Sequence, residues 1–367
     1  MTLYHFSGAG NNFIVLDGRN ADMAEYRTPE RIVSLCTQYH TDGLMILGED
    51  LRTEDVRSSS KTPASDEDRS DKGVRQACRL HKTEGGGTEC THSISTAEPL
   101  CPEVGVGKSY DFTDEKSYDF TMEFYNPDGS GGMMCGNGGR CIAAFADYLG
   151  IRPSDGNTFH FLAPDGPHTA ELLDKNDAGW TIRLGMKDVS GITPVLGGYF
   201  LDTGTRHYVR FVDDVEAIDI DVEGPRYRHD PAFAPIGANA NFVQRLPGGG
   251  IKVRTFEKGV EGETLACGTG ITASALASWY DSSRHAERSS CHSELPSCHS
   301  ERSSCHSERS SCHSERSEES VPSPASVHTP VRARQDDLCV DFTPTSPTTF
   351  AAVYLTGPAV LLAQYEW

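Results

Sequence analysis

Apolar and polar positions follow regular periods through much of the chain, and these periods predict the elements of its first part. Strands are expected at residues 3–5, 13–17 and 121–125, and a helix at residues 28–39, where apolar side chains recur every three or four positions. The glycine-rich stretch CGNGGRC then opens a further helix, which Gly150 is placed to end. This part is therefore expected to consist of runs of strands around one central helix.

The second part of the chain repeats this theme. A second glycine-rich stretch, CGTG, opens another helix with a long apolar side. Strands are expected before and after it, at residues 180–184, 199–203, 207–212, 241–244, 252–256, 338–342, 351–355 and 360–364. Runs of strands with one helix in each half favour an α+β protein of two similar lobes over a repeated βαβ sheet.

Two long stretches lack a sustained apolar period and are expected to be polar insertions, at about 49–117 and about 282–337. The second contains the repeat ERSSCHS, which places Cys-His pairs at 291, 298, 305 and 312. Pairs every seven residues match no common zinc spacing, so a solvated loop is preferred over a metal site. Deleting residues 283–334 is accordingly expected to leave activity largely intact.

With the insertions counted inside them, we expect an N-terminal lobe at residues 1–160 and a C-terminal lobe at 161–357. A terminal strand, 358–367, is expected to return to the first lobe. The formal net charge of −20 disfavours nucleic-acid phosphates and anionic membranes as partners. Neither a membrane-spanning apolar run nor a secretory signal is visible, which favours the cytoplasm. The expected partner is a small molecule; a homodimer is considered, but the sequence does not decide the oligomeric state.

Two of the twelve cysteines stand out by their surroundings. Cys135 and Cys267 each precede a glycine-rich helix start, in CGNG and CGTG. Unpaired backbone N–H groups there carry partial positive charge, so a thiolate is expected to be stabilised and its pKa lowered. Cys36, Cys141 and Cys339 lie in apolar surroundings and are expected to be inert packed thiols.

Two such helix starts facing one another predict a specific chemistry. The backbone N–H groups would bind a carboxylate and stabilise the charge that builds on it when an α-proton is removed. One cysteine, as thiolate, would take the proton from one face, and the other, as thiol, would deliver a proton to the opposite face. The configuration of the carbon would invert with no cofactor and no metal.

These motifs resemble the diaminopimelate epimerase family. The resemblance lies in SGAGNNFIVLDG, NPDGSGGMMCGNGGRC, TGTRHYVRFVDDV, GANANFVQ, RTFEKGVEGETLACGTGITA and YLTGPA, and it leaves out only the two insertions. It implies two pseudo-symmetric lobes, each a mostly antiparallel curved sheet around a central helix. It also implies interconversion of LL-2,6-diaminopimelate and meso-diaminopimelate in lysine biosynthesis. Proline racemase, a relative of the same fold, typically has a histidine at the position of Asn137. The asparagine therefore disfavours a proline racemase.

The resemblance also implies a set of site residues. Cys135 and Cys267 would be the acid/base pair, with His207 beside them. The residues expected to bind substrate are Asn11, Asn126, Gly136, Asn137, Asn241, Glu257, Lys258, Gly268 and Thr269. Within this set, the amides of the two helix starts would hold the reacting carboxylate and Asn11 would line the pocket. Asn126 and Asn241 would hold the distal end of the amino acid, and Glu257 its distal ammonium.

Three departures from the family pattern bear on specificity. Lys258 stands where an arginine is usual and cannot form a bidentate fork with a carboxylate. Thr205 replaces an asparagine, and the usual glycine-rich GIGADG stretch is shortened at residues 40–43. These changes keep two alternatives open: an epimerase or racemase of another amino acid, and a degenerate relative that binds an amino acid without turning it over.

Overall fold

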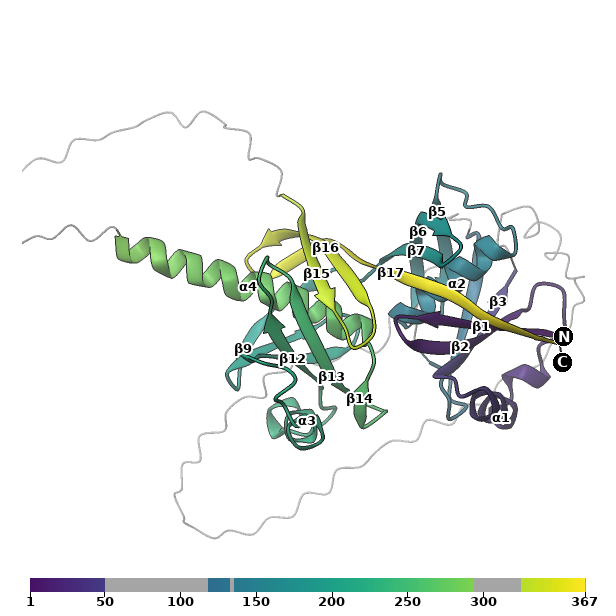
Figure 1. Ribbon diagram of the computed structural model, residues 1–367, viewed down its shortest axis with the longest axis horizontal. Coiled ribbons are helices and arrows are strands. Elements are labelled where there is room, and N and C mark those ends of the chain that lie inside the picture. The colour runs from purple at the N-terminus through teal and green to yellow at the C-terminus, as the bar shows by residue number, and fades with distance from the viewer. Residues whose placement is uncertain (50–117, 133–134, 294–324, 367) are drawn as a thin grey trace, which may run out of the picture. The chain divides into compact units, whose positions relative to one another are not determined.

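A computed structural model describes residues 1–49, 118–132, 135–293 and 325–366 of the chain. Most of the first expected insertion, and all but the start of the Cys-His repeat in the second, lie outside these residues. Figure 1 shows the described elements coloured along the chain. In this part of the chain, no helix is long and apolar enough to span a membrane.

The first part of the chain builds a sheet with two crossovers. Helix α1 (Pro29–Tyr39) joins a parallel pair of strands, β2 and β3, and helix α2 (Gly136–Tyr148) joins the parallel pair β4 and β5. The other neighbours are antiparallel. The strands are β1 (Thr2–Gly8), β2 (Asn11–Asp17), β3 (Gly43–Gly48), β4 (Phe120–Tyr125), β5 (Thr158–Ala163), β6 (Gly166–Asn176) and β7 (Gly179–Gly185).

The second part repeats this order. Helix α3 (Ile220–Arg228) joins the parallel pair β11 and β12, and helix α4 (Gly268–Ser293) joins the parallel pair β13 and β15. Short strands β8 (Val189–Ser190) and β9 (Thr193–Val195) precede the repeat. The others are β10 (Gly198–Asp202), β11 (Arg206–Phe211), β12 (Asn239–Arg245), β13 (Ile251–Glu257), β14 (Gly262–Thr264), β15 (Val327–Arg332), β16 (Asp337–Ser346) and β17 (Thr349–Glu366).

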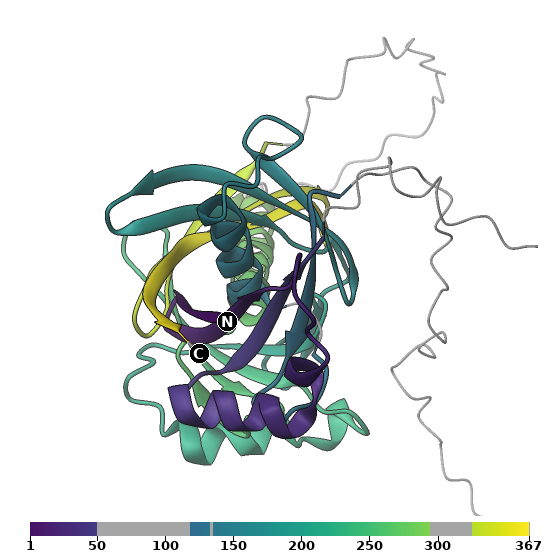
Figure 2. The same cartoon turned by 90° about the vertical axis from the view of Figure 1, so that its right-hand side faces the viewer.

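The matching order of crossovers confirms two pseudo-symmetric α+β lobes. In each, a mostly antiparallel sheet surrounds one central helix; Figure 2 shows α2 enclosed by strands of the first lobe. Strand β17 links the two lobes, because it pairs with β16 of the second lobe and with β7 and β1 of the first.

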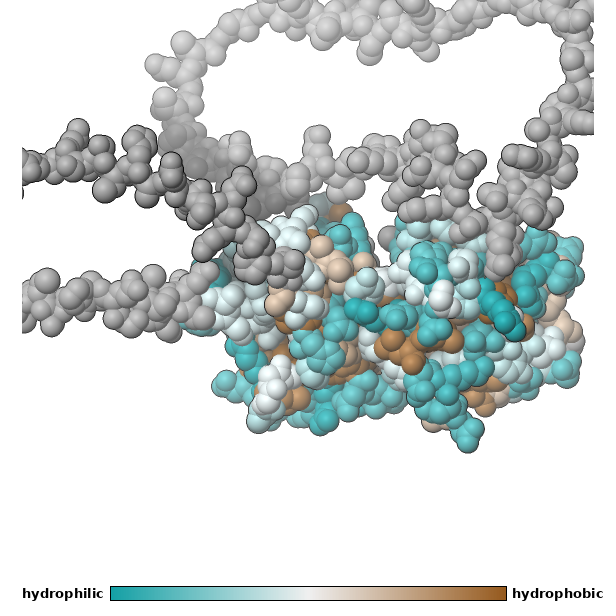
Figure 3. Space-filling view, turned by 90° about the horizontal axis from the view of Figure 1, so that it is seen from above, coloured by the Kyte–Doolittle hydropathy of each residue, from teal (hydrophilic) through white to brown (hydrophobic). Residues whose placement is uncertain are grey.

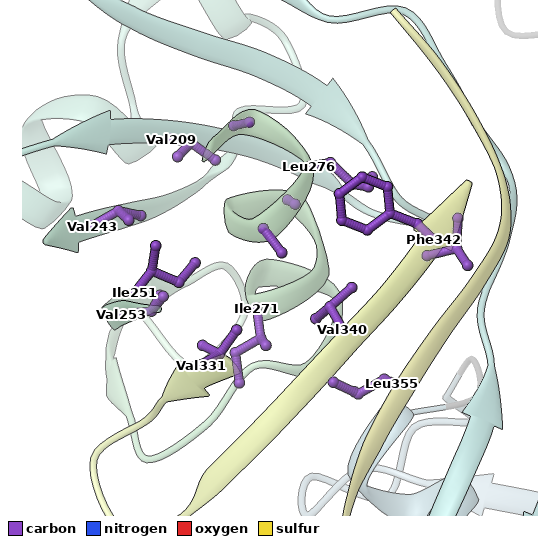
Figure 4. Close-up of a cluster of buried hydrophobic side chains, with 14 of the residues drawn as sticks. Val209, Val243, Ile251, Val253, Ile271, Leu276, Val331, Val340, Phe342 and Leu355 are labelled. Atoms are coloured by element: carbon purple, nitrogen blue, oxygen red, sulfur yellow. The ribbon is translucent and has the colours of Figure 1, made fainter. Parts of the chain in front are cut away.

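The central helices are buried because their sequences present small and apolar side chains to the strands around them. Residues 136–146 of α2 are all buried. In Figure 4, Ile271 and Leu276 of α4 point toward a ring of aliphatic and aromatic side chains from the strands, Val209, Val243, Ile251, Val253, Val331, Val340, Phe342 and Leu355. Each such buried side chain contributes about 1.5–3 kcal/mol to stability. The two helix N-termini are thereby fixed in position.

The predicted second insertion, at about 282–337, extends too far toward the C-terminus. Residues 327–332 form β15, in which Thr329 and Val331 alternate inward with exposed neighbours. The adjoining polar repeat and Pro330 hid this alternation in the sequence. The two closing strands expected at 351–355 and 360–364 are one strand, β17, which continues through Gly357 and Pro358. Helix α3 was missed because Gly224 and Pro225 lie inside it and its apolar face is weak.

The surface of this part of the chain mixes residue types. On the face shown in Figure 3, hydrophobic side chains form separate patches among hydrophilic ones. Large hydrophobic side chains that are exposed are scattered over several elements, such as Leu173 on β6, Val222 on α3 and Leu362 on β17. Scattered exposure of this kind is normal for a folded domain and marks no docking face.

Candidate active site

Cys135 and Cys267 occupy equivalent positions at the starts of the two central helices. The Cys135 carbonyl accepts the first helical hydrogen bond from Gly139 N at 2.7 Å, and the Cys267 carbonyl accepts one from Ile271 N at 2.8 Å. Each cysteine is therefore the N-cap of its helix, with the unpaired N–H groups of the first turn directly behind the thiol. Both thiols are free.

The two helix starts meet. A Cβ atom added to Gly268 would lie 3.3 Å from the Gly136 Cα, which only the absence of side chains at both positions allows. The Asn137 side chain closes the contact by donating from Nδ2 to the Ala266 carbonyl at 2.8 Å. The glycines after each cysteine thus bring two positive helix ends to one place.

Burial, and not the helix ends, dominates the acidity of the two thiols. Burial raises the pKa of Cys135, and it raises that of Cys267 well above the ordinary value. Backbone N–H groups of the first helical turn oppose the shift in both cases. The expectation of a lowered pKa was therefore wrong, because taking a thiolate out of water costs more free energy than its interaction with these N–H groups returns.

Glu257, the last residue of β13, lies beside both thiols. Its charge raises the pKa of each cysteine, and it shares a hydrogen bond with Cys267. Burial raises the pKa of the Glu257 carboxyl itself. The sequence placed this residue at the distal end of the substrate, whereas its contact with Cys267 puts it at the centre of the site.

His207 ends a chain of hydrogen bonds that starts at Cys267. The Cys267 Sγ lies 3.5 Å from Thr269 Oγ1, which lies 3.0 Å from His207 Nε2. Thr205 Oγ1 is 2.9 Å from the same nitrogen. Burial of the fully enclosed ring lowers the pKa of His207 to about 3, so the ring is neutral at physiological pH.

Asn241 holds this histidine from behind. Its Nδ2 lies 3.1 Å from His207 Nδ1 and donates to the Tyr208 carbonyl, while its Oδ1 accepts from Thr255 Oγ1. Because Nδ1 of the ring accepts, Nε2 carries the proton and donates to the threonines. Asn241 is 1% exposed and its amide is occupied by protein groups. The predicted role in holding the distal end of a substrate does not fit this position.

On the other helix, Asn137 and Arg140 form the polar support. Asn137 Nδ2 also donates to Asn11 Oδ1, and its Oδ1 accepts from Arg140 Nη2 at 2.8 Å. The Arg140 guanidinium is fully buried and also donates to the carbonyls of Gly136 and Pro358. The sequence analysis missed Arg140; an arginine on the buried side of an otherwise apolar helix was the available signal.

The remaining predicted residues lie at the rim. Asn126 donates from Nδ2 to Ser130 Oγ within its own turn, and the Lys258 side chain is exposed. Asn239, which the sequence analysis did not single out, accepts from Lys258 N at 2.8 Å and donates to the Arg206 carbonyl. Asn239 therefore braces the loop that carries Lys258.

The shortened stretch at residues 40–43 is a tight turn between α1 and β3. His40 has a left-handed backbone, with φ of 52°, and ends the helix. Asp42 Oδ2 accepts from Asn12 N at 2.8 Å, and Asp42 N donates back to the Asn12 carbonyl. Asp42 also raises the pKa of Glu257 through its charge, so the turn borders the site.

The fold has two similar α+β lobes, each with an N-cap cysteine on its central helix. It has counterparts among solved structures. A phenazine biosynthesis protein of the PhzF family from Bacillus anthracis matches with a TM-score of 0.52 at 9% identity, covering 100% of this chain and 98% of that one. Another PhzF family protein, from Enterococcus faecalis, matches with a TM-score of 0.50 at 10% identity, covering 100% and 98%.

Sequence comparison is more specific. Residues 199–309 match the diaminopimelate epimerase family model. Diaminopimelate epimerases of Flavobacterium psychrophilum and Chlorobaculum tepidum are 42% and 40% identical, over 44% of this chain and 61% and 63% of their own lengths. That of Gemmatimonas aurantiaca is 28% identical over 76% of this chain and 80% of its own. The chain is thus similar to diaminopimelate epimerases, and it spans about three fifths of the length of the first two.

Proposed function

We propose that the protein is a diaminopimelate epimerase, an isomerase that interconverts LL-2,6-diaminopimelate and meso-diaminopimelate in lysine biosynthesis. The single observation that carries the proposal is the meeting of two helix starts, each with a free N-cap cysteine. The similarity to diaminopimelate epimerases supports the choice of substrate.

The reacting carboxylate binds between the helix starts, on the N–H groups of Gly136, Asn137, Gly268 and Thr269. These groups and the helix dipoles stabilise the charge that develops as the α-proton leaves. Cys135 and Cys267 act from opposite faces, one as thiolate base and the other as thiol acid. The reaction needs no cofactor, because the preorganised amides supply the stabilisation.

Glu257 receives the α-ammonium of the substrate, since its carboxyl lies beside the thiols. The incoming ammonium then places a cation next to two buried thiols whose pKa values are raised in its absence. A nearby cation favours a thiolate, so substrate binding activates the base. His207 stays neutral and, with Thr205 and Thr269, fixes the environment of Cys267.

The distal end of the substrate would reach the rim, where Lys258 offers a charge for the second carboxylate and Asn126 offers an amide. A lysine holds a carboxylate as a point charge and not as a fork. This difference supports the second candidate, an epimerase of another amino acid. A preference for a monocarboxylate substrate in side-by-side assays would favour that candidate.

Incubation with LL-2,6-diaminopimelate in D₂O tests the proposal. Deuterium is expected at one α-carbon, with formation of the meso isomer. Folded protein that gives no exchange would falsify the proposal, and tight binding measured by calorimetry without turnover would identify a degenerate binding relative. We also propose a cytoplasmic location, which is supported by the free thiols of Cys36, Cys135, Cys141, Cys267 and Cys339.

A further inference from the structure

Outside the proposed active site, one strand pair brings three metal-binding side chains together. His328 lies on β15, and Cys339 and Asp341 lie on β16. In the antiparallel register His328 stands directly opposite Asp341, and Cys339, two residues away, projects from the same face. The nitrogen, sulfur and oxygen atoms lie within 4.8 Å of one another, and this is the one such group among the described residues.

The distances approach those of a metal site. His328 Nδ1 lies 2.8 Å from Asp341 Oδ1, and Cys339 Sγ lies 3.1 Å from Nδ1 and 3.3 Å from Nε2 of the same ring. Ligand atoms around a tetrahedral zinc ion are about 3.3–3.7 Å apart, as follows from bonds of about 2.0–2.3 Å. The His328 side chain is 66% exposed, so its ring can turn to present a lone pair.

The Arg183 guanidinium lies on the other side of the Asp341 carboxylate, at ion-pair distance. Arg183 Nε lies 3.9 Å from Asp341 Oδ2, and the Arg183 guanidinium is packed 3.9 Å above the Tyr354 ring. This leaves Oδ1 facing His328 and Cys339.

We propose that His328, Cys339 and Asp341 bind a divalent transition metal, with Zn²⁺ as the ion that best suits a mixed nitrogen, sulfur and oxygen set. Water takes the fourth position on the exposed side. The imidazole binds neutral and the carboxylate ionised, so binding releases one proton, from the Cys339 thiol. The ion links β15, the first strand after residues 294–324, to β16.

Cobalt binding to the full-length protein, first stripped with a chelator, tests the site. Co²⁺ is expected to bind at about one equivalent with a thiolate-to-cobalt charge-transfer band. Cys339→Ser abolishes the band, and His328→Ala weakens binding by at least about tenfold. Asp341→Asn weakens binding too, and it keeps a side chain that still pairs with His328. Cys36→Ser, which removes a buried thiol of α1, is the matched control and retains the band.

The Cys-His repeat and the two active-site thiols are the competing binders. A fourfold serine variant at Cys291, Cys298, Cys305 and Cys312 retains the band if the proposal holds. Loss of the band in this variant, or its persistence in Cys339→Ser, overturns the proposal. Zn²⁺ is also expected to raise the Tm of the wild type by more than that of Asp341→Asn; equal shifts in both would likewise count against the proposal.

Discussion

The two helix starts are alike in backbone and different in what stands behind them. At Cys135 the support is Asn137, Asn11 and the buried guanidinium of Arg140. At Cys267 it is Thr269, Thr205 and a neutral His207, with the Glu257 carboxyl hydrogen-bonded to the thiol. Cys135 therefore lies near the Arg140 cation. Cys267 lies against a carboxyl and a chain of hydrogen bonds that ends at a neutral imidazole.

The positions of the two thiols and their acidity therefore have different structural origins. The repeated lobe supplies two equivalent positions for proton transfer, while the side chains behind them set the thiolate population of each. The charge of Arg140 lowers the pKa of Cys135 and opposes the effect of burial. No arginine acts on Cys267 in this way, and the pKa of Cys267 rises further. Cys135 is expected to be the more readily ionised of the pair.

The largest expected effect follows from removing either thiol. Cys135→Ala and Cys267→Ala each lose a proton-transfer group, so kcat/KM for epimerisation should fall by about 10²–10⁴-fold or more. Cys36→Ala, at a packed thiol of α1, is the control and should retain activity. If one of the two variants kept near-normal turnover, a two-thiol mechanism would be ruled out.

A second prediction concerns pH and distinguishes the Cys267 side. The pKa of His207 is about 3 in the fold and 6.5 unfolded, so the unfolded chain binds more protons between these values. The stability from keeping the ring neutral is present above pH 6.5 and is lost as pH falls toward 3, by about 5 kcal/mol at most. Denaturant unfolding of the wild type across this window measures it.

His207→Gln removes this titration and should flatten the pH dependence of the free energy of unfolding. Asn137→Ala, the equivalent change on the Cys135 side, should leave the slope unchanged, because it removes no titrating group. Parallel slopes for the wild type and His207→Gln would show that the ring is not buried in its neutral form.

A smaller effect tests the Cys135 side. Arg140→Met removes the buried cation, so the pKa of Cys135 should rise further, and its alkylation by iodoacetamide at fixed pH should slow. Arg140→Lys keeps the charge and should recover part of the rate. Mass spectrometry of the alkylated peptides separates Cys135 from Cys267, whose rate should not change.

The smallest effect is expected from shortening the second insertion. Removal of residues 294–324 with a short linker should leave kcat/KM within about twofold of the full chain, because loop closure costs little and this segment is polar. The wider deletion of 283–334 takes away β15, with buried Val331, and should unfold the second lobe. Circular dichroism and turnover measured on both variants give the contrast.

The sequence predicted most of the fold and the place of both cysteines at the helix starts. Paired glycine-rich helix starts and periodic apolar positions carry their signal locally, so the lobes, the central helices and the two cysteines were found. Strands such as β3 and β15 were missed, since a continuous apolar run or a flanking polar repeat conceals the period of two.

Roles that depend on packing were harder to predict. Two neighbouring strands carry these residues, β12 with Asn239 and Asn241 and β13 with Glu257. Which of the three faces the thiols, the core or the rim depends on how the strands pair and pack. The acidity of the thiols was misjudged for a related reason, because the sequence reveals the helix end and not the depth of burial around it.

Strand β17 has a consequence for how the protein is made. The later residues of β17 pair with β1, while its first residues pair with β16. Strand β1, which pairs with β2 on one side, therefore lacks its second neighbour until everything in between has been synthesised. At about 5–20 residues per second, β1 waits tens of seconds with an unpaired edge. Folding on the ribosome is thus expected to leave the first lobe open, and to bring the two thiols together only as the final strand emerges.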